Sequence, residues 1–381
     1  MSIAFSFKEK ITHILNILNI LKNEVVFTLA LCLSVVSSFF STPKIEYIDF
    51  RVLFTLFNLM VIVSAFKHMK ILDKIAVGLL TKFDNSKKIS LVLIYLTFFS
   101  SMLITNDVAL ITFVPLALII SKRANINPMK LVIFQTLAAN IGSGLTPMGN
   151  PQNLFIFSYY NLAALDFFKI MLPFTFLGFI WLFILNNTQK SKKLKFDLED
   201  IIIDNKVQVI LFSVLFILII LSVFNIINYS LAFIITILTV VILNKNLLIK
   251  VDYILLLTFV CFFIFIGDLS NLHIIKQFAK SFLQNKTTTY FASIILSQIV
   301  SNVPCSILLA NFTSNWRELL LGVNIGGLGT LVASLASVIS YKLYINDRTS
   351  NSQSRYLSLF SLYNIISLLV FTIVNYFIFV F

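Results

Sequence analysis

The sequence predicts an all-α polytopic membrane protein. Of its 381 residues, 59% are hydrophobic and only 12% are charged, whereas a soluble protein keeps about a quarter of its residues charged to cover its surface. The mean hydropathy is +0.96, so most of the surface must face a lipid bilayer. Several nearly uncharged runs approach the roughly 20 residues that a spanning helix needs. These runs are 25–40, 52–66, 207–224, 231–243 and 357–381.

Charge and motifs exclude other classes. The net charge of +13 is high enough to suggest a nucleic-acid partner, but the basic residues gather in loops between apolar runs, as they do at the cytoplasmic face of membrane proteins. We therefore expect no nucleic-acid partner. Cys32, Cys261 and Cys305 lie in apolar segments and predict no disulfide framework and no metal site. The sequence contains no HExxH, GxSxG or Walker motif, so we expect neither an enzyme nor a cofactor.

The apolar runs, basic loops and amphipathic segments give a topology of about ten spanning helices and two re-entrant hairpins. The expected elements, in chain order, are spanning helices at 23–41 and 50–66, an amphipathic segment at 67–86, a hairpin between 87 and 123, a broken helix from Pro128, a helix at 167–186, a Lys-rich loop at 187–206, helices at 207–224, 229–243 and 252–268, an amphipathic segment at 269–286, a second apolar pair at 288–313, a second broken helix and a last helix at 357–380.

The distribution of basic residues sets the orientation of this topology. With a cytoplasmic N-terminus, it leaves only seven of the 29 Lys and Arg residues outside, a strong positive-inside bias. Those seven are Lys44, Arg51, Lys169, Lys276, Lys280, Lys286 and Arg317. We expect an integral protein of the inner or plasma membrane of a bacterial cell.

The segment between Lys87-Lys88 and Lys122-Arg123 predicts the first hairpin. Both basic flanks should be cytoplasmic, yet only about 33 residues separate them, and two full crossings need roughly 40 plus a turn. The polar run Thr105-Asn106-Asp107 lies at its middle. The simplest solution is a hairpin that enters from the cytoplasm, turns at membrane depth and returns; two short tilted spans are the alternative. Ser301-Asn302-Val303-Pro304 occupies the same central position in the second apolar pair.

Two glycine-rich stretches predict the broken helices. Residues 140–153 contain three glycines and two prolines, and six of the ten glycines fall within 140–150 and 324–330. A continuous helix does not tolerate so many breakers. Irregular backbone at membrane depth survives only where it lines a cavity or is buried in protein. The alternative is that these glycines only allow close helix packing.

The order helix, amphipathic arm, hairpin, broken helix, helix occurs twice within a single membrane domain, 1–381. The first copy is 50–186 and the second is 252–380. The first hairpin enters from the cytoplasm and the second from outside, so the copies are inverted. Inverted repeats with discontinuous helices are the architecture of many secondary transporters. The corresponding residues are Asn140-Ile141-Gly142 and Asn324-Ile325-Gly326, Thr146 and Thr330, and Asn106 and Asn302.

The hairpin tips and broken helices predict a site for an anion and a cation. Helix N-termini suit an anion, whereas helix C-termini and unwound carbonyl groups suit Na⁺. Asparagine offers one acceptor and two donors, so Asn106 and Asn302, with Asp107, are candidate Na⁺ ligands that can bridge ion and substrate. The candidate substrate- or ion-binding residues are Thr105, Asn106, Asp107, Asn140, Gly142, Ser143, Thr146, Asn150, Asn153, Ser301, Asn302, Asn324, Gly326 and Thr330.

Asp107 is the only carboxylate that this topology places at membrane depth. Such residues are costly to bury and usually functional, so Asp107 is expected to bind Na⁺, carry a proton, or do each in turn. The alternative, which is compatible, is an N-cap for a helix that begins at Val108. Asp166, Asp268 and Glu318 are expected near the interfaces, in contact with solvent.

Taken together, these motifs resemble the ion transporter superfamily, specifically its citrate-transporter-like domain, over residues 25–380. Thr105-Asn106-Asp107 followed by Pro115 resembles the first hairpin of that group, 140–153 its first broken helix and 301–304 its second tip. The group includes arsenite permeases, sodium–proton antiporters and divalent anion–sodium symporters. The resemblance implies an elevator mechanism, in which one domain carries both hairpins and the substrate across while a scaffold domain forms a homodimer interface.

The residues at the tips leave the function open. Divalent anion symporters carry Ser-Asn-Thr at both tips, but the third residue here is Asp107 or Val303. Thr-Asn-Asp is more similar to the arsenite and sodium–proton branch, whereas 149–153 resembles carboxylate permeases. One hypothesis is a secondary transporter for a small anion, such as a di- or tricarboxylate, coupled to Na⁺ or H⁺. Another is arsenite or antimonite efflux or Na⁺/H⁺ antiport, with Asp107 exchanging the cation. The last is an ion channel, which inverted hairpins without a continuous pore disfavour.

Overall fold

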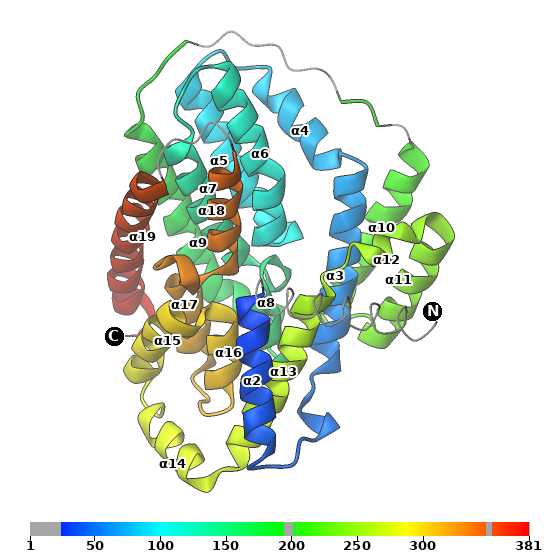
Figure 1. The fold of residues 1–381 in the computed structure, drawn as a ribbon, viewed down its shortest axis with the longest axis vertical. Coiled ribbons are helices and arrows are strands. Elements are labelled where there is room, and N and C mark those ends of the chain that lie inside the picture. Colours follow the sequence, from blue (N-terminus) through cyan, green and yellow to red (C-terminus); the bar gives the residue numbers. More distant parts are fainter. Residues whose placement is uncertain (1–23, 194–200, 204, 348–352, 381) are drawn as a thin grey trace, which may run out of the picture.

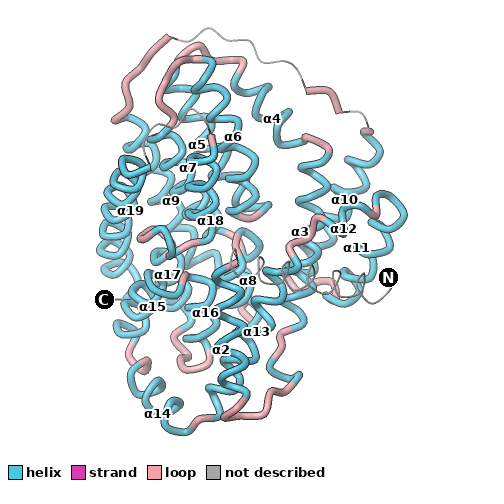
Figure 2. The backbone as a smooth tube through the Cα atoms, in the orientation of Figure 1, coloured by secondary structure: helices cyan, strands magenta, loops and turns pink. Residues whose placement is uncertain are grey.

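The computed structural model describes residues 24–193, 201–203, 205–347 and 353–380. All regular structure in these residues is helical, and they contain no strand (Figures 1 and 2). The predicted cytoplasmic N-terminus and part of the Lys-rich loop lie outside them. The α-helices are α2 (Val25–Ser38), α3 (Phe50–His68), α4 (Ile71–Leu80), α5 (Ser86–Ile104), α6 (Asn106–Arg123), α7 (Met129–Gly142), α8 (Pro151–Tyr159), α9 (Ala164–Asn187), α10 (Lys206–Val223), α11 (Tyr229–Asn244), α12 (Asn246–Ile249), α13 (Tyr253–Asn271), α14 (His273–Phe282), α15 (Lys286–Val300), α16 (Asn302–Ala310), α17 (Trp316–Gly326), α18 (Leu335–Asn346) and α19 (Gln353–Asn375).

The long apolar helices are those of an integral membrane protein. Among the described residues, six helices are long and apolar enough to cross a membrane, and Val26–Ser38 and Tyr229–Asn244 are apolar but shorter. The six are Phe50–His68, Ser86–Ile104, Ala164–Asn187, Lys206–Val223, Tyr253–Asn271 and Gln353–Val380. The all-α membrane class is therefore confirmed, whereas the count of about ten spans stays a prediction.

Two helical hairpins turn on a single residue each. Thr105 alone separates α5 from α6, and Ser301 alone separates α15 from α16. The two residues have nearly the same backbone angles, φ 72° and ψ 149° for Thr105 and φ 74° and ψ 154° for Ser301. Residues other than glycine rarely adopt this region of φ and ψ, because it costs about 1–3 kcal/mol of conformational energy. Such strained turns persist only where the surrounding structure fixes them, which marks both tips as candidate functional positions.

The two hairpins point toward each other. With the longest axis vertical, α5 and α6 lie in the upper half of the molecule and α15 and α16 in the lower half (Figure 1). The first residues of α6 and α16, Asn106 and Asn302, both approach the Asn140–Gly327 pair, so the tips lie close together. This arrangement places polar residues from both hairpins in one region, far from either end of the molecule.

The broken helices begin and end where the glycine-rich stretches predict. Helix α7 ends at Gly142, two 3₁₀ turns cover Ser143–Leu145 and Pro147–Gly149, and α8 begins at Pro151. The side chain of Asn150 caps α8, because its Oδ1 accepts from the Asn153 N–H at 2.9 Å. Helix α17 ends at Gly326, a 3₁₀ turn covers Leu331–Ala333, and α18 begins at Leu335. Both helices therefore break beside the hairpin tips.

The remaining helices lie on two sides of these elements (Figure 1). Helix α3 packs against α10 and α11, at the right of Figure 1, and α4 links α3 to the first hairpin. Helix α2 packs along α13 below them. Helix α19 covers the opposite side, where it packs on α7 and α17. The hairpins and broken helices are thus enclosed between two groups of apolar helices.

Candidate substrate and cation site

Asn140 joins the two hairpin tips. Its Oδ1 accepts from Asn106 Nδ2 at 3.3 Å, at the first tip, and from Ser334 Oγ at 3.0 Å. Its Nδ2 donates to the carbonyl oxygen of Gly327 at 3.2 Å and to Ser337 Oγ at 3.3 Å. These contacts form what we call the Asn140 network. All four side chains are buried, so the network fixes the first tip against both broken helices.

The second tip reaches the same network through Gly327. The side chain of Asn302 packs on this glycine, where an added Cβ would lie 2.7 Å from Asn302 Nδ2. Ser301 Oγ donates to the carbonyl oxygen of Ala333 at 3.3 Å, on the second broken helix. Asn106 and Asn302 therefore approach the Asn140–Gly327 pair from opposite hairpins. Since each also occupies the first position of its helix, the N-termini of α6 and α16 meet in this region.

A second group of amides, the Asn324 network, holds the first broken helix. Asn324 Nδ2 donates to Asn153 Oδ1 at 2.7 Å, and Asn324 Oδ1 accepts from Asn150 Nδ2 at 3.2 Å. Asn150 Nδ2 also donates to Ser143 Oγ at 3.1 Å, and Asn153 Nδ2 to the Gly144 carbonyl oxygen at 3.0 Å. The amide N–H groups of Asn150, Asn153 and Asn324 therefore donate to oxygens of the protein itself. The network therefore ties α17 to the break between α7 and α8.

The two predicted threonines cap the first helix of each hairpin. Thr146 Oγ1 donates to the carbonyl oxygen of Met102, three residues before the Thr105 tip. Thr330 Oγ1 donates to the carbonyl oxygen of Gln298 at 3.1 Å, three residues before the Ser301 tip. Both hydroxyl protons thus satisfy carbonyl groups at a helix end, which lack partners within the helix.

Gly142 and Gly326 allow the broken helices to approach the hairpins. An added Cβ at Gly142 would meet Phe98 O and Ser101 Oγ on α5, and one at Gly326 would meet Ser297 on α15. These contacts agree with the packing role that was the alternative for the glycine clusters. The two glycines therefore shape the site by close approach of helices.

Asp107, next to Asn106 in the first tip, faces a cavity and takes no part in the Asn140 network. It occupies the first turn of α6, which begins at Asn106, so the expected N-cap position before Val108 is wrong; Thr105 precedes the helix instead. The Asp107 side chain is half-buried, and its Oδ1 is shielded from solvent with no hydrogen-bond partner in the described structure. A carboxylate oxygen without a partner favours a bound cation or proton. The first turn of a helix, with its partial positive charge, also favours this carboxylate.

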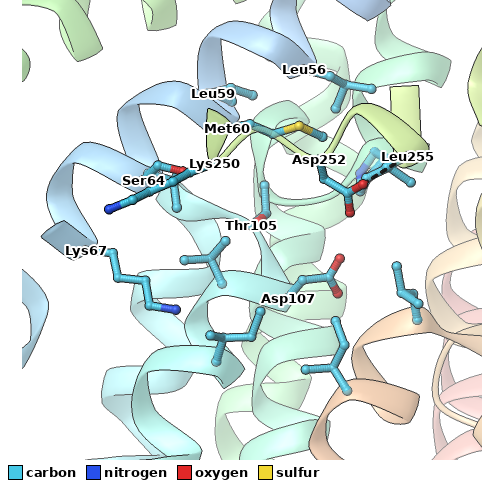
Figure 3. Close-up of a pocket in the computed structure, with 16 residues that line it drawn as sticks. Leu56, Leu59, Met60, Ser64, Lys67, Thr105, Asp107, Lys250, Asp252 and Leu255 are labelled. Atoms are coloured by element: carbon cyan, nitrogen blue, oxygen red, sulfur yellow. Dashed lines mark hydrogen bonds between the residues drawn. The ribbon is translucent and has the colours of Figure 1, made fainter. Parts of the chain in front are cut away.

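Asp107 faces a cavity between the first hairpin and α3. The cavity has a volume of about 240 Å³, and Thr105 and Asp107 contribute its polar wall on the hairpin side. Figure 3 shows the carboxyl groups of Asp107 and Asp252 directed into this space from opposite sides. Lys67 and Lys250 also line it. The cavity thus joins the hairpin tip to charged residues from outside the hairpins.

Asp252 is the site residue that sequence reasoning missed. It precedes α13 and caps that helix, since its Oδ1 accepts from the Leu255 N–H at 2.9 Å. An Asp before an apolar run indicates a helix cap and nothing more. Asp252 also lines the cavity that Asp107 faces, because the α12–α13 loop lies near α6 in the fold. No local sequence pattern predicts that tertiary contact.

Two of the acidic residues expected in solvent are buried. Asp268 is 1% exposed and Glu318 is 3% exposed, so that expectation is wrong for both. Glu318 lies in the first turn of α17, where the helix dipole favours a carboxylate. Asp268 is buried because α2 packs on α13 through serine residues. Asp166 is partly exposed, 3.9 Å from Lys169.

The structure therefore divides the predicted site residues into three groups. The tips and the residue that joins them meet near the centre, the Asn324 network ties α17 to the break between α7 and α8, and four residues act in packing or capping. The central group is Thr105, Asn106, Asp107, Asn140, Ser301 and Asn302; the Asn324 network holds Ser143, Asn150, Asn153 and Asn324; and the last group is Gly142, Thr146, Gly326 and Thr330.

Comparison with known proteins identifies the family. The sequence is 40% identical over 300 residues to an uncharacterised transporter of Methanocaldococcus jannaschii, covering 78% of this chain and 81% of that protein. It is 28% identical over 303 residues to the inner membrane protein YbiR of Escherichia coli, covering 79% and 81%. A shorter match, 33% over 78 residues, covers 20% of this chain and 14% of the putative transporter arsB of Dictyostelium discoideum. The family model described as citrate transporter matches residues 13–315. The chain is a membrane transporter that belongs to the citrate transporter family.

Proposed function

We propose that this protein is a secondary active transporter that moves a small anion, a di- or tricarboxylate, across the plasma membrane with Na⁺ or H⁺ as the coupling ion. The observation that carries the proposal is the convergence of two helix N-termini, α6 at Asn106 and α16 at Asn302, on one buried region. Each N-terminus carries partial positive charge, so a pair of them favours an anion.

The Asn side chains at the tips add hydrogen-bond donors to the partial positive charge of the two helix N-termini. Asn106 uses Nδ2 for Asn140, and its Oδ1 accepts from the Asp107 N–H at 3.1 Å. Asn302 is buried beside Gly327, and neither of its side-chain atoms is committed to a hydrogen bond in the described residues. An anion between the tips would receive amide donors and helix N–H groups together. Such a site binds carboxylate groups without a permanent positive charge.

Asp107 and Asp252 supply the cation side of the proposal. Both face the same cavity, and the Oδ1 of Asp107 lacks a partner there. Two carboxylates around a small space attract a cation. Without a cation between them, their negative charges repel each other. We infer that Asp107 binds the coupling ion and that Asp252 draws ions toward it. The hydroxyl group of Thr105 offers a third oxygen.

An elevator motion fits the division of these residues. Asp107 belongs to the first hairpin, whereas Asp252 and Lys250 belong to the α12–α13 loop, and Lys67 to α3. If the hairpins move relative to those elements, as the inverted repeats at 50–186 and 252–380 suggest, Asp107 leaves Asp252 on each crossing. The similar backbone angles of Thr105 and Ser301 support the repeat. A homodimer and a cytoplasmic N-terminus complete the proposal.

Uptake into proteoliposomes tests this function. Labelled succinate and citrate are supplied with and without an inward Na⁺ gradient, and separately with an inward proton gradient. We expect accumulation driven by one gradient and lost in Asn106→Ala and Asn302→Ala. No accumulation of either anion under any gradient, with protein shown to be folded, would contradict the carboxylate proposal.

The alternative is arsenite or antimonite efflux or Na⁺/H⁺ antiport. The unpartnered Oδ1 of Asp107 favours it, because antiport needs one carboxylate that binds the cation and the proton in turn. A Na⁺-dependent change of internal pH without any organic anion, lost in Asp107→Asn, would establish antiport. Arsenite accumulation in inverted vesicles would establish efflux.

A further inference from the structure

Asp268 is a buried carboxylate that the site described above does not use. It lies one turn before the end of α13, facing α2, and is 1% exposed. Its Oδ2 is 2.9 Å from Ser37 Oγ and 3.3 Å from Ser38 Oγ, both in the last turn of α2. Its Oδ1 is shielded from solvent and has no hydrogen-bond partner within the described residues.

The serine hydroxyl groups cannot satisfy this cluster of oxygens. Ser37 Oγ is also 3.0 Å from the Ser34 carbonyl oxygen, and Ser38 Oγ is 2.7 Å from the same atom. Each hydroxyl carries one proton, so two protons serve four contacts between oxygens. Two protons cannot give each of the four contacts a full hydrogen bond, so each hydroxyl group either shares its proton between two acceptors or leaves one contact without a proton, in addition to the unpartnered Oδ1.

The surroundings of Asp268 are also electronegative. No ion pair within 4.0 Å joins Asp268 to a basic side chain of the described residues. Helices α2 and α13 run side by side in the same direction, because Ser37 contacts Asp268 and Ser41 Oγ accepts from Asn271 Nδ2 at 3.1 Å (Figures 1 and 2). Both helices therefore end here, and each adds the partial negative charge of a C-terminus.

We propose that Asp268, Ser37, Ser38 and the Ser34 carbonyl group form a Na⁺ site between α2 and α13. A buried carboxylate at two helix C-termini requires neutralisation. The two hydroxyl groups connect the Ser34 carbonyl oxygen to Asp268 Oδ2, the Oδ1 of the same carboxylate brings the oxygens to five, and oxygens are the ligands that hard cations prefer. A cation at their centre would coordinate the oxygens that the two hydroxyl protons leave unsatisfied. It would also neutralise the negative charge of Asp268.

A neighbouring cavity offers the cation a way in. It has a volume of about 290 Å³ and is lined by Gly267 and Asn271, on either side of Asp268 in the chain. Glu46 and Asp49 line it as well, and two carboxylates raise the local concentration of cations. This site shares no element with the hairpin tips. It therefore holds its ion on α2 and α13 while the hairpins carry theirs.

Thermal unfolding of the purified protein in detergent tests the site without any transport assay. Asp107→Asn serves as the background, because it removes the proposed coupling site. In choline buffer above pH 8, added Na⁺ is expected to raise the Tm of this variant. Adding Asp268→Asn, which mimics a protonated carboxyl group, should raise the Na⁺ concentration at the midpoint of that response by at least about tenfold, or remove the response.

A milder substitution covers the case in which Asp268→Asn fails to fold. Ser38→Ala removes one oxygen and leaves the carboxylate, so we expect a several-fold higher Na⁺ midpoint in the same background. Ser213→Ala, on α10, removes a hydroxyl group that donates within its own helix, so it is the matched control and should leave the midpoint unchanged. An equal Na⁺ response with and without Asp268→Asn, an unchanged midpoint in Ser38→Ala, or no Na⁺ response in the background itself would each overturn the proposal.

Discussion

The two hairpins share a backbone and differ in their chemistry. Both turn on one residue in the same strained conformation, and both have a threonine that caps the helix before the tip. At the third tip position, however, the first hairpin has Asp107 and the second has Val303. The geometry is therefore duplicated, whereas the charge is present once. In the proposed mechanism, both tips bind the anion and only the first binds the coupling ion.

The asparagines at the ends of α7 and α17 also differ in their contacts. Asn140 and Asn324 hold corresponding positions, but Asn140 contacts the tip residue Asn106, while Asn324 contacts Asn150 and Asn153 of the first broken helix. The Asn150-Pro151 break has no counterpart in sequence after Gly326. Asn324 therefore turns toward a partner that only the first copy supplies. In the predicted inverted repeat, the two copies would therefore share a fold and have separate tasks.

The largest effect is expected from the charge that only one hairpin has. Asp107→Asn should lower gradient-driven transport at least about 100-fold, since it removes the proposed cation ligand at a cost of about 2.7 kcal/mol in the transport barrier. Asp84→Asn, an exposed carboxylate on the loop before α5, is the matched control and should leave transport unchanged. Equal rates for Asp107→Asn and wild type would show that the two tips do not differ in function.

The next effect separates the two amides. Asn140→Ala leaves Asn106 Nδ2 and the Gly327 carbonyl group without their hydrogen-bond partner. Each buried polar group left unpaired lowers the free energy of unfolding by about 1–3 kcal/mol. We expect a lower Tm and a raised KM for the anion. Asn324→Ala should lower the Tm by a similar amount, because it frees Asn150 and Asn153, and should change KM less. A larger KM change in Asn324→Ala would reverse the roles given to the two networks.

A similar loss of stability is expected at the glycines, where the two copies agree. Alanine at Gly142 or Gly326 would push the broken helix away from the hairpin, and overpacking costs about 1–3 kcal/mol. Gly78 in α4 has no atom within 4 Å of an added Cβ, so Gly78→Ala is the control and should be neutral or stabilise the helix by up to about 1 kcal/mol. Thermal unfolding measures all three. Similar Tm values for Gly142→Ala and Gly78→Ala would remove the packing role.

The smallest effect compares the two capping threonines. Thr146→Val and Thr330→Val each remove one hydrogen bond to a carbonyl group, worth about 1 kcal/mol. Thr146 is half-buried and Thr330 is exposed, so water can replace only the second. The Tm should therefore fall more in Thr146→Val. A larger fall in Thr330→Val would show that the second tip depends more on its cap.

Local signals predicted the parts of this fold that local chemistry determines. Glycine and proline break a helix wherever they gather, so the ends of α7 and α17 followed from the sequence. The tips followed from polar residues in the middle of short apolar pairs. Asp252 and Asp268 did not follow, because their roles depend on contacts with α6 and α2, more than a hundred residues away. The capping by Thr146 and Thr330 was missed for the same reason.

The central claim is that both tips serve one site, and protection of cysteines at the tips tests it most directly. In a variant without Cys32, Cys261 and Cys305, a single cysteine replaces either Thr105 or Ser301, and its alkylation by a small membrane-permeant reagent is timed in proteoliposomes. Na⁺ with the transported carboxylate should slow the reaction at both positions, with the same dependence on anion concentration. Protection at one tip alone, or with two different concentration dependences, would contradict a shared site.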